Sequence, residues 1–462
     1  MKMRQLFLII CAAVLPWAGA PAALAAPSLQ ALIDAARPGA YVQPAPGVYA
    51  GPVVISKPLT LDGGGKVTID NGGTGSVVTI RGNGVTVQGL RLAHSGNQHD
   101  DLDAGVAVLG DGNVIKDNTF IECLFGVSLL KSDNNVIRRN HITSQSRAGL
   151  GMRGDGIRLW YSKNNRIEDN TISKSRDFVV WYSADNIIRG NKVSDGRYGL
   201  HFMYSRYNLV EDNTFARNST GIFLMYSDSV VVHHNRIIQA QGATGIGIGF
   251  KEASNLDILD NEILYNGTGL YLDVSPFQPD TTNRIYRNTI AFNDIGVKFL
   301  NDWHGNLFRD NRFISNIRHV AVSTFAGASH NLWQDNYWDD YQGFDRDHDG
   351  FGDTPYRALA YADQLWMDVP NAAFFKGSPS LSFLDFMERL APFARPKLML
   401  EDKKPRMGKR FAALTLDKEG ANQGNALHTF GLTTGADKAG TSMQRLDPFG
   451  LNGDTGKEKP HD

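Results

Sequence analysis

The chain has little cysteine and almost no net charge. Only two of its 462 residues are cysteine, Cys11 and Cys123, and 47 Lys and Arg nearly balance 48 Asp and Glu, for a net charge of −1. A near-neutral chain has no basic surface to attract phosphates, so we expect no nucleic-acid partner. Cys11 lies in an N-terminal segment that we expect to be removed. The remaining Cys123 therefore predicts a chain without an intrachain disulfide.

Long hydrophobic runs are absent beyond the first 25 residues. Lys2 and Arg4 precede an apolar run from Leu6 to Leu15, and Ala23-Leu24-Ala25 follows as a small-residue cleavage site. This order predicts a secretory signal peptide over residues 1–25. No later run approaches the roughly 18 apolar residues of a membrane span. We therefore expect an exported, soluble mature protein.

Helical spacing is also missing from most of the chain, and a short repeat takes its place. Apolar residues followed by Tyr-Ser return in four places: residues 156–162, 178–183, 199–205 and 221–227. A second phrase, Asn-x-(Ile/Val/Phe), recurs at steps mostly of 21 to 27 residues. A period near 22 with three short apolar triplets predicts a β-solenoid with three strands per coil. Leucine-rich repeats have a similar period, but their Leu-x-x-Leu-x-Leu phrase is absent.

We therefore expect an all-β fold, a single-stranded right-handed parallel β-helix. Side chains alternate inward and outward along each short strand, which places Arg158 outside the core. The Asn that precedes each strand suits a tight corner, and stacked Asn side chains can hydrogen-bond from coil to coil as a ladder. The expected core positions in the central coils are Ile157, Leu159, Leu200, Phe202, Ile222 and Leu224.

The β-helix domain is predicted over residues 26–376, with regular coils over about 105–338. A short amphipathic helix at Ser28–Ala36 precedes the first coil. Such a helix would cover the otherwise open end of the sheets.

Two further segments follow the β-helix. Residues 377–395 contain a predicted helix at Ser378–Leu390, with Ser378 as N-cap and Pro379 in the first position. Residues 396–462 are polar, rich in Gly and Lys and without a pattern, so we expect a disordered tail.

One outward column combines methionine with aromatic residues. The same position in four successive coils is taken by Trp160, Trp181, Met203 and Met225, and the next position by Tyr161, Tyr182, Tyr204 and Tyr226. Because neighbouring coils lie about 4.8 Å apart, Met203 and Met225 can offer two thioethers to one ion, with His201 on the same face. Thioether plus imidazole suits Cu(I).

Two other interpretations of this column stay open, a packed rib and a docking patch for a protein partner. The docking candidates are Trp160, Trp181, Tyr182 and Tyr204. If copper binds, its affinity should fall only mildly toward pH 6, where we expect His201 to begin to protonate. Met152, on a loop inserted at 147–153, is a further candidate ligand.

An acidic loop near the end of the solenoid has the spacing of a calcium site. Asp345, Asp347, Asp349 and Asp353 occupy positions 1, 3, 5 and 9, and Gly350 at position 6 allows the sharp turn. Position 12 is Tyr356 instead of a bidentate Glu, and no flanking helices are evident. We interpret the loop as a structural calcium site, with chance as the alternative.

Three weaker candidates complete the set. His233 and His234, beside Asn235, are a metal candidate, but neighbours on a strand point to opposite faces and cannot share an ion unless a corner intervenes. We favour a corner pair bonded to backbone. The loop at 94–104 holds His94 and His99 beside Asp100, Asp101 and Asp103, as a divalent-metal loop or simply a solvated one. Cys123 is interpreted as buried core rather than a copper thiolate.

Several further phrases stand in the coils or on either side of them: Gly47-Val-Tyr, Ile55-Ser-Lys-Pro-Leu-Thr-Leu, the Asn-x-Ile coils, Trp338-Asp-Asp-Tyr and Phe383-Leu-Asp-Phe-Met-Glu-Arg-Leu. With these phrases the chain resembles, over about 28–395, the NosD family of periplasmic accessory proteins in nitrous-oxide reductase maturation. This resemblance implies a non-enzymatic periplasmic protein that helps supply copper, or sulfide, to the copper centre of the reductase. It also implies partners: the permease and ATPase of an inner-membrane ABC transporter, a copper-donating lipoprotein chaperone, and the reductase. The apolar helix residues Phe383, Phe386 and Leu390 are implied contacts to the permease.

The alternative function is that of the secreted polysaccharide lyases, hydrolases, epimerases and carbohydrate binders that share the solenoid. Glycoside hydrolases need two carboxylates at a set separation on one sheet face. Asp155, Arg158 and Asp177 fall near one face, but Val179 and Phe223 take the neighbouring outward positions. The phrases Gly-His-Gly, Arg-Ile-Lys and Asp-Pro-His-Glu, found in such enzymes, are absent.

Overall fold

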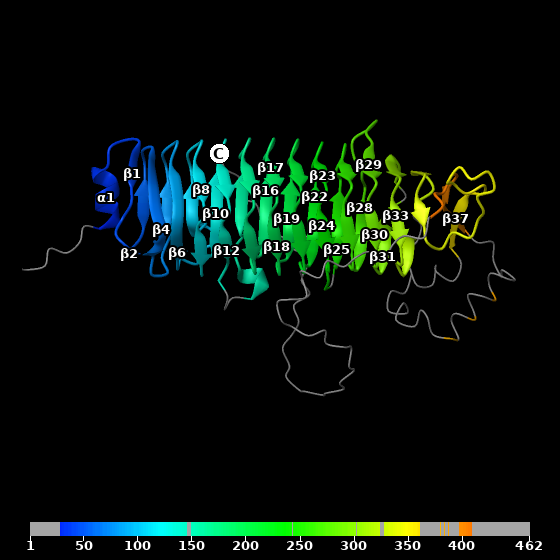
Figure 1. Ribbon diagram of the computed structural model, residues 1–462, viewed down its shortest axis with the longest axis horizontal. Coiled ribbons are helices and arrows are strands. Elements are labelled where there is room, and N and C mark those ends of the chain that lie inside the picture. Colours follow the sequence, from blue (N-terminus) through cyan, green and yellow to red (C-terminus); the bar gives the residue numbers. More distant parts are fainter. Residues whose placement is uncertain are drawn as a thin grey trace, which may run out of the picture.

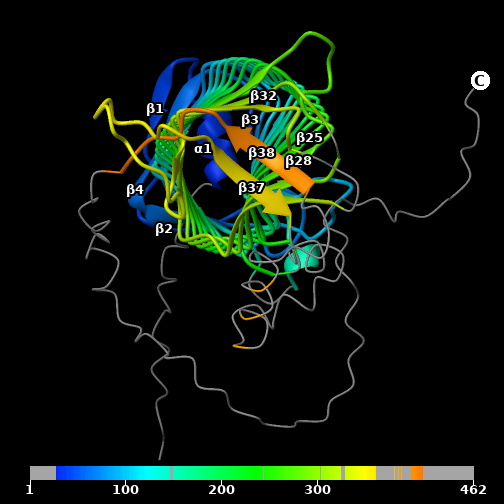
Figure 2. The ribbon, with the colours of Figure 1, turned by 90° about the vertical axis from the view of Figure 1, so that its right-hand side faces the viewer.

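The computed structural model describes residues 28–145, 149–242, 244–301, 303–323, 328–360 and 397–408, with Pro379, Phe383 and Met387 as single residues. The coils are stacked in one row, from α1 (Leu29–Ala35) at one end to β37 (Tyr356–Ala360) at the other (Figure 1). Along the row the strands of successive coils overlie one another (Figure 2). The predicted all-β, right-handed parallel β-helix is confirmed. The predicted signal peptide lies outside the described residues.

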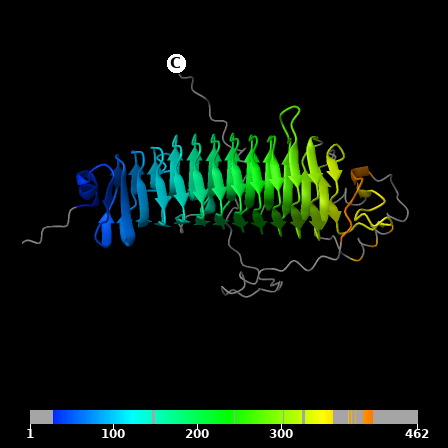
Figure 3. The same ribbon diagram turned by 45° about the horizontal axis from the view of Figure 1, so that its top comes forward.

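Two sheets form the walls of the solenoid, and Figure 3 shows their strands side by side along its length. Neighbouring coils pair in parallel and in register, whereas β37 and β38 pair antiparallel at the end. The 12-stranded sheet consists of β3 (Val53–Ile55), β5 (Val78–Ile80), β7 (Ala104–Val108), β10 (Phe125–Leu130), β13 (Ile157–Trp160), β16 (Asp177–Trp181), β19 (Tyr198–Met203), β22 (Thr220–Met225), β25 (Ile246–Lys251), β28 (Thr268–Asp273), β31 (Ile295–Phe299) and β34 (Arg318–Val322). The 26-stranded sheet consists of β1 (Ala40–Val42), β2 (Gly47–Ala50), β4 (Leu59–Asp70), β6 (Thr86–Ala93), β8 (Val114–Lys116), β9 (Thr119–Ile121), β11 (Val136–Arg138), β12 (His141–Thr143), β14 (Arg166–Glu168), β15 (Thr171–Ser173), β17 (Ile187–Arg189), β18 (Lys192–Ser194), β20 (Leu209–Glu211), β21 (Thr214–Ala216), β23 (Val231–His233), β24 (Arg236–Ile238), β26 (Asp257–Leu259), β27 (Glu262–Leu264), β29 (Asn283–Tyr286), β30 (Thr289–Ala291), β32 (Asn306–Arg309), β33 (Arg312–Ile314), β35 (Leu332–Gln334), β36 (Tyr337–Trp338), β37 and β38 (Lys397–Asp402).

The core follows the alternation of the short strands. All the core positions predicted in the central coils are fully buried: Ile157, Leu159, Leu200, Phe202, Ile222 and Leu224. The first coil is covered by α1, as predicted, because Leu29 and Ile33 are buried against it. Gln30 also bonds the backbone N–H and C=O of Val54 at 2.8 and 3.0 Å. The helix therefore closes both the apolar core and part of the exposed edge.

A ladder of buried asparagines runs along one corner of the solenoid, as the sequence predicts. The ladder consists of Asn118, Asn140, Asn170, Asn191, Asn213, Asn235, Asn261, Asn288, Asn311 and Asn336. From Asn140 onward each Oδ1 accepts the backbone N–H of the Asn in the preceding coil, whereas Asn118 Oδ1 accepts the N–H of Leu90. The last acceptor is a different residue, because Asp402 Oδ2 receives both the backbone N–H and the Nδ2 of Asn336 at 3.0 Å.

The prediction of a disordered tail from residue 396 is wrong for 397–408. Residues 397–402 form β38, which pairs with β37, and buries Met399, Leu400 and Asp402. The strand has no periodic signal because its apolar residues are consecutive and charged residues surround them. Of the predicted helix at Ser378–Leu390 only Pro379, Phe383 and Met387 are described. These three are helical, and Phe383 and Met387 are exposed. Phe386 and Leu390 lie outside the described residues.

Among the described residues, no helix has the length and apolar character needed to cross a membrane.

Candidate functional site

The outer face of the 12-stranded sheet brings together the three side chains predicted to bind Cu(I). His201 Nε2, on β19, lies 3.3 Å from Met225 Sδ, on β22 of the next coil. Met203 and Met225 are register partners at the ends of the same two strands, and Met203 packs on the cluster that contains Met225. The site is therefore built by the coil-to-coil register.

This part of the outer face is enclosed by aromatic rings, so it is far less exposed than outward positions usually are. His201 and Met225 are only 5% and 3% exposed, and Met203 is half-buried. The Tyr198 ring stacks on the imidazole at 4.6 Å between centroids, and the Trp181 ring meets it edge-on at 5.4 Å. The sequence did not reveal this enclosure. The register shift between Asp177 and Val179 that positions Tyr198 has no local signal.

Burial lowers the pKa of His201 to about 4. The imidazole is therefore neutral throughout the physiological range, and the expectation that it begins to protonate near pH 6 is wrong. The physical reason is that an apolar enclosure disfavours the charged form. Within the described residues, His201 Nδ1 has no hydrogen-bond partner.

Metal-free protein should lose stability in acid because of His201. Its folded-state pKa of about 4 lies below the ordinary value of 6.5, so the unfolded chain binds the proton first as pH falls. This contribution is fully present above pH 6.5 and is lost as pH falls through 4, a change of about 3 kcal/mol in the free energy of unfolding. Denaturant titrations from pH 7 to 4 measure it. His201→Phe should flatten this dependence, whereas the half-exposed His94→Phe control should not; equal slopes in all three proteins would contradict the assignment.

The predicted docking residues form a continuous surface beside this site. Parallel tyrosine rings stack at 4.7, 5.1 and 4.8 Å along the column Tyr161, Tyr182, Tyr204 and Tyr226. Trp160 and Trp181 lie 5.4 Å apart in the neighbouring column. Tyr161 and Tyr204 remain about half exposed, at 48% and 50%. The rings therefore pack on one another as a rib and still leave an aromatic surface exposed.

The carboxylates considered for the enzyme alternative do gather on one face, as predicted. Asp155 and Asp177 are buried, and Arg176 lies within 3.0 Å of the first and 3.7 Å of the second. Arg197 bonds both oxygens of Asp177, and Arg158 lies 3.6 Å from Asp155. Burial raises the pKa of Asp155 to about 6. Both carboxylates are thus held by arginines.

The acidic loop at 345–353 makes the sharp turn that the sequence predicts. Gly350 has φ +88°, as the sharp turn at position 6 requires, and its N–H donates to Asp345 Oδ2 at 3.1 Å. Oxygens of Asp345, Asp347 and Asp349 all lie within 4.8 Å of one another. Asp353 Oδ2 accepts the Arg346 N–H at 3.0 Å, and Lys404 Nζ lies 3.1 Å from Asp349. An ion would have to compete with that lysine.

Calcium should raise the melting temperature of the parent by a few degrees, because it binds the folded loop only. Asp347→Ala with Asp349→Ala should abolish the gain, as measured by thermal melts with calcium and with a chelator. Asp100→Ala with Asp101→Ala, in the other acidic loop, is the control and should keep the gain. A parent melting curve that is the same with calcium and chelator would show that the loop is not a calcium site.

The other predicted ligands lie elsewhere. Met152 ends η1 (Leu150–Met152), where its side chain is 67% exposed and its carbonyl lies 3.0 Å from His99 Nε2. Cys123 is buried and free, and burial raises its thiol pKa to about 12, as expected of core rather than of a copper thiolate. His233 and His234 are separated by a corner, as the favoured interpretation of the sequence expects, because His234 has φ +53° and the two rings stack.

One histidine cluster was not found from the sequence. His319 Nε2 lies 2.9 Å from Asp339 and 3.4 Å from Asp340, at the edge of a cavity of about 760 Å³ beside β37. Burial alone would lower the pKa of His319, but its bonds to the two carboxylates raise it to about 9. The largely buried imidazole thus forms ion pairs with two exposed carboxylates, Asp339 and Asp340.

Comparison with known proteins places the chain in a family. A family model described as "Periplasmic copper-binding protein (NosD)" matches residues 144–343, and one described as "Right handed beta helix region" matches 64–181. The "Probable ABC transporter binding protein NosD" of Pseudomonas aeruginosa is 31% identical over 371 residues, which cover 76% of this chain and 84% of that protein. The chain belongs to the NosD family. The NosD of Stutzerimonas stutzeri, with the same description, is 30% identical over 75% of this chain and 82% of its own length.

A solved structure supports the fold. The A-module of the mannuronan C-5 epimerase AlgE6 from Azotobacter vinelandii has a TM-score of 0.52 and 18% identity, over 66% of this chain and 93% of that module. At this identity the likeness concerns the β-helix alone. The NosD relatives are described as binding proteins, whereas this structural neighbour is an enzyme.

Proposed function

We propose that this protein is a non-enzymatic, periplasmic accessory protein that carries Cu(I) as cargo. It would work with an inner-membrane ABC transporter in assembling the copper centre of nitrous-oxide reductase. The observation that carries the proposal is the contact between His201 and Met225, with Met203 in register beside them. The copper-binding description of the family and the transporter-binding description of its relatives support it.

The geometry suits a shared soft metal ion. Metal–nitrogen and metal–sulfur bonds of about 2.0 and 2.3 Å, at angles near tetrahedral, separate the two ligand atoms by roughly 3.3 to 3.6 Å. The observed separation of His201 Nε2 and Met225 Sδ is 3.3 Å. A neutral imidazole and two neutral thioethers bind Cu(I) without releasing a proton, so affinity should stay nearly constant between pH 8 and 5.

The aromatic surface beside His201 is the place where a protein that delivers or receives the copper ion would bind. A metal ion passes between proteins only where donor and acceptor ligands approach within a few ångströms. Trp181 contacts His201, and the aromatic surface continues from it through Trp160, Tyr182 and Tyr204. We propose that a copper-donating lipoprotein chaperone docks there and that the reductase receives the ion. The exposed Phe383, with Phe386 and Leu390, would contact the permease, which the ATPase drives.

Replacing Met203 and Met225 by Leu tests the proposal. Leu has nearly the volume of Met, so stability should change by less than about 1.5 kcal/mol for each site. Cu(I) affinity under reducing conditions, measured by competition with a chromogenic chelator, should fall at least tenfold. Reductase matured in cells that carry the variant should lack its copper centre.

The control removes two methionines from the end of the solenoid, as Met399→Leu with Met407→Leu, and should bind Cu(I) like the parent. Parent-like Cu(I) binding by the Met203 and Met225 variant would leave the column as packing and docking surface only, and the copper site would have to be sought elsewhere.

A further inference from the structure

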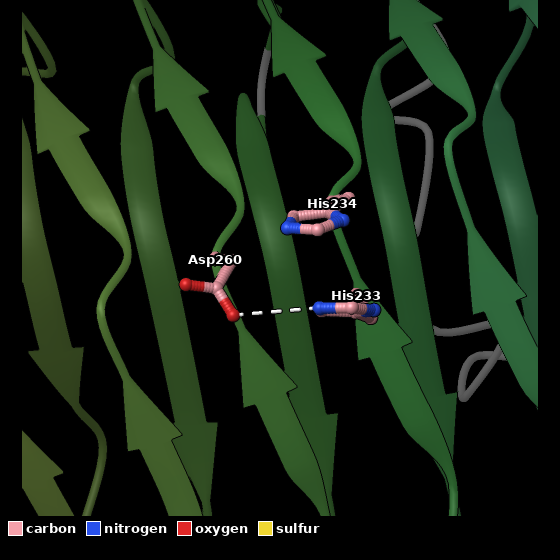
Figure 4. A group of neighbouring side chains, drawn as sticks. All are labelled: His233, His234 and Asp260. Atoms are coloured by element: carbon pink, nitrogen blue, oxygen red, sulfur yellow. Dashed lines mark ion pairs between the residues drawn. The ribbon is translucent and has the colours of Figure 1, made fainter.

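His233 and His234 lie on the same outer surface because the chain turns between them. His233 ends β23, and His234 adopts the left-handed backbone, with φ +53°, at the corner that follows. Figure 4 shows one ring above the other. The ring centroids lie 3.8 Å apart, and the ring planes differ by 23°. Their side chains are 31% and 55% exposed, so an ion in solvent can reach both.

Carboxylates from the neighbouring coils flank the pair. Asp260, the corner residue of the next coil, places Oδ2 3.4 Å from His233 Nε2 (Figure 4). Asp212, the corner residue of the preceding coil, places Oδ1 3.9 Å from His234 Nδ1. Both corners are left-handed like that of His234, with φ +54° and +56°. Asp212, His234 and Asp260 thus occupy the same corner in three successive coils.

The carboxylate of Asp260 is held in place by Arg287 of the next coil. Arg287 donates from Nε to Oδ1 at 2.8 Å and from Nη2 to Oδ2 at 2.6 Å, and this arginine holds the pKa of the carboxyl below its usual range. Each carboxylate oxygen accepts at two lone pairs, so one remains on each for a metal ion. Carboxylates that bind metals are commonly fixed by such hydrogen bonds.

Corner residues of other coils show which kind of residue usually stands where His234 stands. Asp117 is paired there by Arg139 of the next coil through two bonds of 2.7 and 2.8 Å, as Asp260 is paired by Arg287. Asp212 meets His234 at the corresponding position. A guanidinium only donates hydrogen bonds, whereas a neutral imidazole carries a lone pair. With His234 in place of an arginine, this corner position can coordinate a cation instead of forming an ion pair.

From these contacts we propose that His233, His234 and Asp260 bind a divalent transition-metal ion such as Zn²⁺ or Cu²⁺. Their ligand atoms all lie within 4.8 Å of one another. Two imidazoles and a carboxylate are typical ligands of such ions, and water can complete the coordination. No thioether takes part, so the site selects a different ion from the one proposed for the His201 site, and it goes beyond the function proposed above.

The test uses the chelator-treated full chain. Zn²⁺ alone, titrated by calorimetry, should bind at one site; Cu²⁺ alone should give an electron paramagnetic resonance signal with coupling to two imidazole nitrogens. His233→Gln with His234→Asn should lower the Zn²⁺ affinity at least tenfold and remove that coupling. Asn tolerates the left-handed corner, so the fold should persist.

A matched control exists elsewhere in the chain. His94 also has φ +53° and lies 2.9 Å from Asp70, but within the described part of the chain it belongs to no group of three potential metal ligands. His94→Asn should bind Zn²⁺ like the parent. If the double histidine variant misfolds, Asp260→Asn, which should also lose at least tenfold in affinity, replaces it.

Two outcomes would overturn the proposal. One is a parent that binds Zn²⁺ no better than the double histidine variant, and the other is a Cu²⁺ signal unaffected by that variant. Met203→Leu with Met225→Leu should keep Zn²⁺ binding. The two proposals are therefore tested independently, because each has its own metal ion and its own variant.

Discussion

Leu200→Asp should abolish soluble expression. Leu200 is fully buried in β19 and is the register partner of Ile222 on the next coil. An isolated carboxylate in that environment costs several kcal/mol, even if it takes up a proton. The net stability of a folded domain is only about 5–15 kcal/mol, and a solenoid cannot open one coil without exposing its neighbours.

The measurement is the soluble fraction after expression, with circular dichroism on any soluble protein. Tyr207→Asp is the matched control, because Tyr207 is 56% exposed and its left-handed φ of +57° suits Asp. This control should remain soluble. Soluble Leu200→Asp with the parent's spectrum would mean that the inward face of β19 has been assigned wrongly.

The core could be predicted from the sequence because a parallel solenoid makes burial a local property. Each coil repeats the strand of the coil before it, so the alternation of Ile157 and Leu159 already fixes which side faces inward. The same reasoning reached the asparagine ladder and the register of Met203 with Met225, since neither depends on anything outside consecutive coils.

The chemistry of the sites could not be predicted in the same way. That His201 is enclosed, and so neutral, depends on Tyr198, whose place follows from a register shift beside Asp177. That His233 and His234 share a surface depends on one backbone angle, the left-handed φ of His234. Isolated residues rarely adopt that angle. The stacked corner imposes it. The adjacent Asn235 marks that corner in the sequence, but how the two rings face each other is fixed only by the folded backbone.

The strand β38 at the end of the solenoid could not be predicted because its partners lie far away along the chain. Asp402 meets Asn336 across 66 residues, and β38 is recognisable only once β37 and the last rung of the ladder are in place. Because charged residues flank its short apolar stretch, β38 is not recognisable from the sequence as the strand that closes the core.

Asp402→Leu should destabilise the last coils strongly. Asp402 is fully buried, and its Oδ2 accepts from the N–H and Nδ2 of Asn336 and, at 3.2 Å, from Trp338 Nε1. Leucine leaves these donors buried without an acceptor, and each such loss costs about 1–3 kcal/mol. We expect a melting temperature lower by several degrees and faster hydrogen exchange at Asn336 and Trp338.

Asp402→Asn should behave nearly like the parent, because Asn supplies the same acceptor that every earlier rung of the ladder supplies. Burial raises the pKa of Asp402, so the charge itself adds little to stability, and a neutral amide should not be worse. If the Asn and Leu variants lose the same stability, the hydrogen bonds to Asn336 are not what holds β38 in place. Apolar packing of Met399 and Leu400 would then have to close the solenoid by itself.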